Sequence, residues 1–425
     1  MRKTLTVTLT AVFALLLLSQ TALAIPAFAR KYGFNCNMCH VAFPKLNDWG
    51  QRFRDNGYQI PGQAGLEKTV FETGIPLAIR TTAGYSIYHN DEGTASGFHL
   101  YGLDLLAAGV LHKNISFLFV YTPRIDEPAA DWTGPGIGNN PAQLAAIESA
   151  NLVFSNIVQD KLNLRVGRFE PGFQLLSSKR LYYILQPFEI YGFAGTRNSY
   201  DFSANHIGVE ATGRFNPGLK YAVGYINGSG ANPDNNKFND LYFAFSKTFG
   251  KGEGQSAGQR VGVFGYLGWQ PTDFDGTITS PLGDINGHNN RNFSRIGADI
   301  SLNWETFNLQ AMAFRGVDDM AFNILDPTMD YTFWGGVVEL DWAGLANNRL
   351  VGSLMYNWVR PPSYDSVNRV NAYSALARYY LGSWSAVNVA LHAEYTYRTV
   401  GEDNPYLFTN KIKENLFTLL LDFDF

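Results

Sequence analysis

The chain has 425 residues and a formal net charge of −4, with 15% aromatic and 16% charged residues. A net charge this small does not favour nucleic acid or a strongly charged partner. The share of charged residues is low for a soluble protein, whereas alternating strands with aromatic girdles would produce it.

The first 24 residues have the three parts of a secretory signal peptide. Arg2 and Lys3 supply positive charge, an apolar run spans residues 5–18, and small residues at 22–24 form a cleavage site. The alternative is an N-terminal membrane anchor, but the run is short and no other run of 18 apolar residues follows. We therefore expect an exported protein whose mature chain begins near residue 25.

Cys36-Asn37-Met38-Cys39-His40 has the spacing of a c-type haem attachment site, and it contains both cysteines of the chain. Such a site needs two thiols for thioether bonds to the porphyrin and a following imidazole for the iron. We therefore predict one covalent haem c on Cys36 and Cys39, with His40 as an axial iron ligand. The alternatives for an exported pair of cysteines are a disulfide, a redox dithiol or another metal site.

Region 25–70 does not alternate and is predicted to be a short helical cytochrome segment. A helix is predicted over residues 44–58, with Pro44 in its first turn and Gly57 at its end. One face of this helix would cover the haem edge with Leu46, Trp49, Gly50 and Phe53. A chain of fewer than about 40 residues seldom folds unaided, so we expect the next domain to house the segment or to be closed by it.

Region 75–425 alternates between polar and apolar residues, as strands do when one face meets lipid and the other a lumen. It is predicted to be all-β, a transmembrane outer-membrane β-barrel of about 16 antiparallel strands. A soluble sandwich or propeller is the rival fold. The predicted strands are 76–88, 98–112, 114–122, 148–158, 161–169, 206–215, 219–227, 240–249, 258–269, 292–303, 306–315, 330–342, 349–359, 369–381, 386–398 and 413–425.

The connections alternate in length. The short ones, after even-numbered strands, are 112–114, 159–160, 216–218, 304–305 and 382–383. The long ones, after odd-numbered strands, are 123–147, 170–205, 228–239, 270–291, 316–329 and 399–412. Short turns face the periplasm and long loops face outward in outer-membrane barrels, so both termini are predicted to be periplasmic. Loop 170–205 either folds into the pore as a constriction or lies outside as a solvated loop.

The motif does not fix the sixth ligand of the iron. Residues 41–88 contain neither histidine nor methionine, so the ligand comes from the barrel, is Lys45 or another weak group, or is absent. His112 is the first candidate, because it ends a strand where the segment should enter. The other candidates expected to face the lumen are His206, His392, Met312 and Met355.

The N-terminal residues 24–33, 36–40, 43–47 and 50–58 resemble the first segment of fused monohaem cytochrome–porins. The best-known members are outer-membrane iron oxidases. The resemblance implies a single-haem cytochrome inside a porin, which takes electrons from ferrous iron outside and passes them to periplasmic carriers. Only the two cysteines and the histidine of the motif match residues with a family role.

These observations predict an outer-membrane electron-transfer protein. Its expected partners are membrane lipid, a periplasmic cytochrome or other carrier, and ferrous iron as a candidate donor, in which case it would act as an Fe(II):cytochrome c oxidoreductase. One alternative is a diffusion porin with a structural or regulatory haem plug. Another is a haem enzyme that acts on a small molecule at an open iron position.

Overall fold

The structure is a computed structural model. It describes residues 27–34, 36–42, 44–63, 65–123, 146–173, 177, 182–184, 188–198, 200–215, 218–230, 234–250, 259–272, 290–345, 349–384, 387–403 and 411–424. The predicted signal peptide and the side chain of Cys36 lie outside this description. Among the described residues, no helix has the length and hydropathy needed to cross a bilayer.

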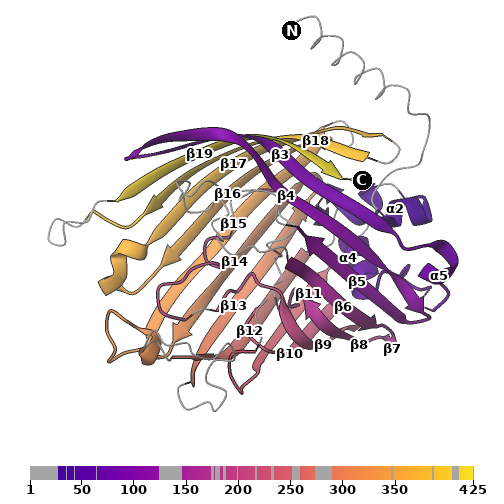
Figure 1. The fold of residues 1–425 in the computed structure, drawn as a ribbon, viewed down its shortest axis with the longest axis horizontal. Coiled ribbons are helices and arrows are strands. Elements are labelled where there is room, and N and C mark those ends of the chain that lie inside the picture. The colour runs from indigo at the N-terminus through magenta and orange to yellow at the C-terminus, as the bar shows by residue number, and fades with distance from the viewer. Residues whose placement is uncertain are drawn as a thin grey trace, which may run out of the picture.

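The described residues form one closed barrel of 16 antiparallel strands, as predicted (Figure 1). Neighbours in the chain pair in turn, and β19 closes the barrel by pairing with β3, with Leu419 opposite Tyr85. The strands are β3 (Leu77–Asn90), β4 (Gly93–His112), β5 (Ile115–Thr122), β6 (Ala146–Phe154), β8 (Asn163–Phe169), β9 (His206–Phe215), β10 (Leu219–Ile226), β11 (Asp240–Phe249), β12 (Gln259–Pro271), β13 (Asn290–Trp304), β14 (Phe307–Asp318), β15 (Tyr331–Leu345), β16 (Leu350–Arg360), β17 (Val370–Trp384), β18 (Val387–Val400) and β19 (Ile412–Asp424).

Alternation of the side chains explains why these segments form barrel strands. In β11, Tyr242 and Ala244 are buried on the lumen side, whereas Leu241, Phe243 and Phe245 are exposed on the outside. An outward row of large apolar side chains suits hydrocarbon, and an inward row of mixed side chains suits a filled lumen. The same alternation in the sequence is what located the strands.

Most strand boundaries differ from the prediction by three residues or fewer, and two differ by four or more. Strand β4 begins at Gly93 instead of residue 98, so the first hairpin turns on Asp91 and Glu92. Strand β6 ends at Phe154 instead of residue 158, because Asn156 has a positive φ of 54° that a strand cannot continue through. A short strand outside the barrel, β7 (Ile157–Asp160), follows it. The chain turns at 159–160 as predicted, since the Lys161 amide donates to the Val158 carbonyl and Gln159 has a φ of 51°.

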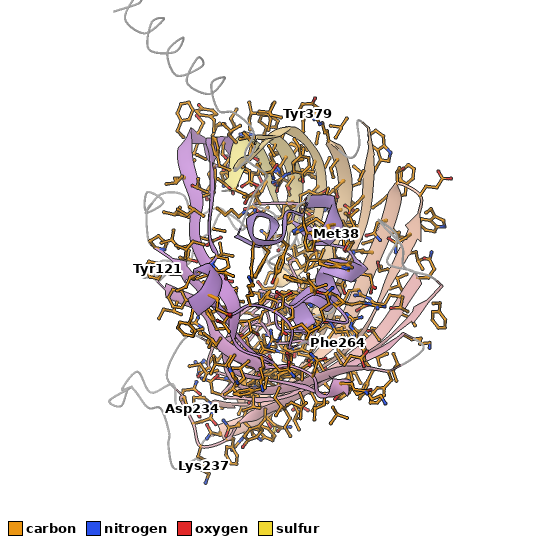
Figure 2. The ribbon with its side chains drawn as sticks, turned by 90° about the vertical axis from the view of Figure 1, so that its right-hand side faces the viewer. Met38, Tyr121, Asp234, Lys237, Phe264 and Tyr379 are labelled. Atoms are coloured by element: carbon orange, nitrogen blue, oxygen red, sulfur yellow. The ribbon has the colours of Figure 1, made fainter. Side chains whose placement is uncertain are left out.

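The N-terminal segment, residues 27–76, extends into the barrel, where Lys45 and Asp55 pair with residues of the wall. Figure 2 shows Met38 within the ring of strands. The segment lies at the turn end, which we define as the end where residues 113–114 and 305–306 connect strands. Its elements are α2 (Ala27–Tyr32), α3 (Cys36–Cys39), β1 (His40–Ala42), β2 (Lys45–Leu46), α4 (Asp48–Asp55) and α5 (Val70–Thr73).

Helix α4 is shorter than the helix predicted over 44–58. Asn47 is its N-cap and accepts a hydrogen bond from the Gly50 amide, so the helix begins after Asn47 and not at Pro44. Gly57, with a φ of 69°, ends the turn as predicted. Phe53 on the inner face of α4 packs against the rings of Phe28, Tyr32, Trp49 and Tyr58.

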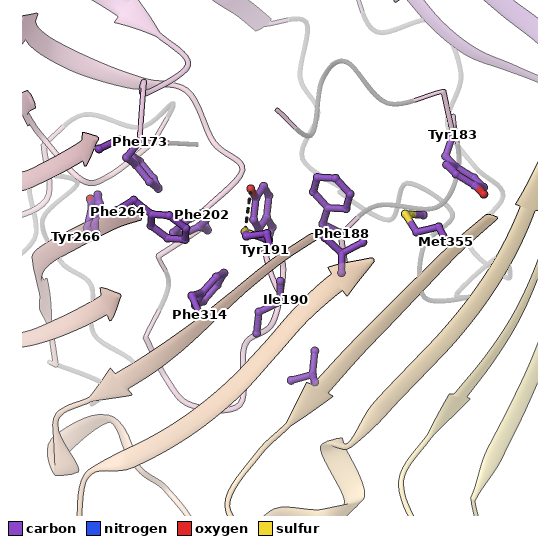
Figure 3. Packing of buried hydrophobic residues seen from close by; sticks show 14 of the residues in the cluster. Phe173, Tyr183, Phe188, Ile190, Tyr191, Phe202, Phe264, Tyr266, Phe314 and Met355 are labelled. Atoms are coloured by element: carbon purple, nitrogen blue, oxygen red, sulfur yellow. Dashed lines mark hydrogen bonds between the residues drawn. The ribbon is translucent and has the colours of Figure 1, made fainter. Parts of the chain in front are cut away.

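The connection between β8 and β9 folds into the lumen. We call its described residues between 170 and 205 the inner loop. Phe173, Phe188, Tyr191 and Phe202 of this loop are almost fully buried and pack against lumen-facing rings that include Phe314 (Figure 3). Of the two arrangements that the sequence left open, the structure has the constriction.

Candidate functional site

The predicted haem motif opens onto an internal cavity. Cys39, at the end of α3, and His40, at the start of β1, line a cavity of about 760 Å³ between the segment and the inner loop. The cavity also meets apolar rings of the segment, Phe28, Phe34 and Phe53. Its volume lies within the roughly 300–1,000 Å³ of small-molecule and cofactor pockets.

The His40 imidazole is oriented by a neighbouring carbonyl. Nδ1 of His40 lies 3.2 Å from the carbonyl oxygen of Pro44, which can only accept a hydrogen bond. Nδ1 therefore carries the proton in this arrangement, and Nε2 is the nitrogen whose lone pair suits a metal. Carbonyl groups play this orienting role for metal-bound histidines in general.

Asn47 joins the motif to helix α4. Its side-chain amide donates to the Met38 carbonyl at 3.1 Å, and its backbone amide donates to the Cys39 carbonyl at 2.9 Å. Gly50 lies so close that a Cβ there would clash with the same Cys39 carbonyl oxygen. The cap of α4 and a required glycine thus hold the last turn of the motif in place.

Lys45 ties the segment to the barrel wall. Its ammonium group pairs with Glu339 at 2.9 Å and with Asp341, both on β15, and lies 4.9 Å from the ring centroid of Tyr182. Gln310 accepts a further hydrogen bond from it at 3.3 Å. Burial alone would lower the pKa of Lys45, but the two carboxylates outweigh burial and raise it. We call this group the Lys45 cluster.

A second buried group, with opposite polarity, lies on helix α4 of the segment. Asp55 of α4 pairs with Lys220 at 2.6 Å and with Arg214 at 3.0 Å, both on the barrel wall, and with Arg54 of its own helix. Burial would raise the pKa of Asp55, but these cations hold it well below its usual value. The segment therefore presents a cation to an acidic wall and an anion to a basic wall.

The sixth-ligand candidates are spread over the barrel. His112 is exposed at the end of β4, and the others, His206, His392, Met312 and Met355, are buried. None of these five is among the described residues that line the cavity, whereas Lys45 lines it within its ion pairs.

Sequence reasoning did not find the Lys45 cluster or the Asp55 pairs. The sequence contained part of the evidence, because Glu339 and Asp341 fall on the lumen side of an alternating strand. Two buried carboxylates there require a cation or hydrogen-bond donors. The lysine that pairs with them lies 296 residues before Asp341 in the chain. Only the docked segment identifies that partner.

The barrel is similar to solved barrel structures. The outer membrane channel DcaP of Acinetobacter baumannii matches with a TM-score of 0.52 and 11% identity, covering 85% of this chain and all of that chain. For OprB of Pseudomonas putida the TM-score is 0.53 and the identity 12%, covering 84% and 95%. For OmpF of Salmonella typhi they are 0.54 and 11%, covering 84% and 100%. No protein-family model and no curated protein sequence matches the chain. These likenesses establish a porin-type fold.

Proposed function

We propose that this protein carries electrons across the bacterial outer membrane. Cys36 and Cys39 would hold one haem c through thioether bonds, and His40 would ligate its iron. The observation that carries the proposal is that Cys39 and His40 line a cavity of about 760 Å³ inside the barrel. An extracellular one-electron donor, with ferrous iron as the candidate, would be oxidised, and a periplasmic cytochrome or other carrier would be reduced.

The residues around the cavity fit a haem. Aromatic rings of the segment suit the porphyrin face. Arg80 and Arg165 on the barrel wall pair with Asp422 and Glu210, and other donors of their guanidinium groups would serve the two haem carboxylates. The bound haem would supply a one-electron Fe(III)/Fe(II) couple. The chain would orient His40 through Pro44, keep bulk water from the iron, and tune its potential through burial and hydrogen bonding.

The position of the segment suits transfer to a periplasmic carrier. The segment and the described end of β19 both lie at the turn end of the barrel, where β19 meets the start of β3. Short turns face the periplasm in outer-membrane barrels. With this orientation both termini are periplasmic and the outward-facing strand residues meet the membrane lipid.

The first test addresses the covalent haem. Membranes that contain the wild-type protein or Cys39→Ala are compared by absorption and pyridine-haemochrome spectra. We expect a c-type spectrum from the wild type and no stably attached haem in the variant. A wild-type protein without covalent porphyrin would refute the proposal. A spectrum of His112→Ala that matches the wild type would exclude His112 as the sixth ligand.

A diffusion porin with a haem plug is the second candidate function, and the likeness to the channel DcaP favours it. Haem-loaded protein in detergent is mixed with ferrous iron while the haem spectrum is followed, and solute flux is measured in liposomes. Reduction without flux supports electron transfer. Flux without reduction at any pH supports the porin.

A further inference from the structure

The inner loop crosses the lumen between the cavity and the loop end, the barrel end opposite the turn end. It hydrogen-bonds to strands around the barrel: the Gly172 amide to Glu210 of β9, Ile184 to Glu394 of β18, and Thr196 to Asp318 of β14. Asn205 reaches Ser149 of β6. Contacts to several strands around the barrel make the loop a fixed partition instead of a flap on one wall.

Aromatic rings form an unbroken series through this partition. Phe188 lines the cavity, and its ring lies 5.2 Å from that of Tyr191. Tyr191 lies 4.6 Å from Phe202, and Phe202 lies 4.8 Å from Phe314 on β14 (Figure 3). These centroid distances fall within the roughly 4.5–7 Å of contacting aromatic pairs.

The series continues to the outer surface of the loop end. Phe314 lies 6.4 Å from Phe333, which lies 6.2 Å from Tyr331. Tyr331 lies 6.4 Å from Tyr364, in the connection between β16 and β17. The first six residues of the series are at most 3% exposed, and Tyr364 is 40% exposed.

We propose that the inner loop separates the cavity lined by Cys39 and His40 from the loop end of the barrel, and that electrons cross the loop through the ring series Phe188–Tyr191–Phe202–Phe314–Phe333–Tyr331–Tyr364. This inference rests on the proposed electron transfer. An external donor such as aqueous ferrous iron loses one electron and becomes ferric, and the ferric haem iron gains that electron. No bond forms or breaks, and the rings remain unoxidised.

The physical argument is packing. Electronic coupling falls steeply across empty or water-filled gaps and is better through atoms in van der Waals contact, and protein interiors are packed as closely as organic crystals. Among the described ring contacts, Tyr191 is the ring that connects Phe188 to the rest of the series. The series therefore depends on Tyr191. Removing that ring opens a gap at one step.

Three variants of the haem-loaded, full-length protein test the series. Tyr191→Leu removes the ring, whereas Tyr191→Phe keeps the ring and removes only the hydroxyl that contacts Met312. Phe173→Leu removes an equally buried ring that touches Phe202 but lies outside the series. Each is placed in liposomes with the loop end outside, and haem reduction by external ferrous iron is timed. Dithionite added in detergent measures the total reducible haem.

We expect slower reduction in Tyr191→Leu and wild-type rates in Tyr191→Phe and Phe173→Leu, at equal haem content. A wild-type rate in Tyr191→Leu, or an equal loss in Phe173→Leu, would overturn the ring series while leaving the proposed function intact. Sugar flux through wild-type liposomes at open-pore rates would overturn the partition. A wild-type protein that lacks haem, or whose haem dithionite reduces and iron does not, would overturn the proposed function instead.

Discussion

Replacing Lys45 with methionine tests whether its buried ion pairs hold the segment inside the barrel. The substitution keeps an unbranched apolar side chain, with sulfur in place of Cδ, and removes the ammonium group. Glu339 and Asp341, whose side chains are 1% and 5% exposed, then lose the cation that lies between them. Removing one partner of a buried ion pair typically costs about 3–5 kcal/mol.

The measurement is hydrogen exchange of the amides in helix α4 of the refolded protein in micelles. Undocking of the segment exposes these amides, so a loss of about 3–5 kcal/mol should speed their exchange by roughly 10²- to 4 × 10³-fold, since 1.4 kcal/mol is tenfold. Amides in strands far from the segment, such as β12, should exchange at wild-type rates.

Two controls sharpen this prediction. Arg52→Met breaks the ion pair with Asp48, in which the arginine side chain is 55% exposed, and such surface pairs contribute about 0–1 kcal/mol. The triple variant Lys45→Met, Glu339→Gln, Asp341→Asn leaves no unpaired charge and should recover part of the loss. The reasoning is refuted if Lys45→Met exchanges like Arg52→Met, or if the triple variant is no more protected than Lys45→Met.

Two further predictions concern the segment. Gly50→Ala should lower the yield of covalent haem, because its Cβ would clash with the Cys39 carbonyl. Gly102→Ala should not lower it, because a Cβ there meets open space. The amount of haem per protein is measured for both variants, and equal yields would contradict the clash. Docking should also depend on acid, because the pKa of Asp55 is lowered in the folded protein. A carboxyl group whose pKa is lower in the folded protein stabilises the fold fully above its unfolded pKa of about 3.9. This contribution is lost as the pH falls through the folded pKa. Cleavage of the wild-type segment by pepsin should therefore rise only below a pH of about 3.9. The Asp55→Asn variant should be cleaved readily above that pH. Cleavage of the wild type that does not depend on pH would contradict the role of Asp55 in docking.

The barrel could be predicted from the sequence because its burial pattern is local and periodic. Successive side chains of a strand point to opposite faces, as the exposed Leu241 and the buried Tyr242 do. The existence and position of a strand can therefore be predicted from a few consecutive residues. Boundaries were wrong where a single backbone conformation decides, as at Asn156, because periodicity carries no information on φ. The start of α4 was missed because Pro44 and Asn47 are both acceptable first residues, and the hydrogen bond from Gly50 decides between them.

The candidate site was only partly predictable. The motif predicts haem binding by Cys39 and His40 from spacing alone, but the contact between His40 and Pro44 depends on the short strand pair that follows the motif. The Lys45 cluster and the inner loop depend on contacts between residues far apart in the chain. No local pattern distinguishes a loop that enters a lumen from one that lies outside it.

The seam between β3 and β19 has a consequence for how the protein is made. Arg80 and Thr82 meet Asp422 across it, and Arg378 of β17 reaches the same carboxylate. Until β19 is present, β18 and β3 are strands with an unpaired edge. The charged side chains of the lumen would then be exposed to lipid through the gap between these two strands. A chain that lacks β19 therefore cannot close the barrel, and membrane insertion requires that β19 has already been synthesised.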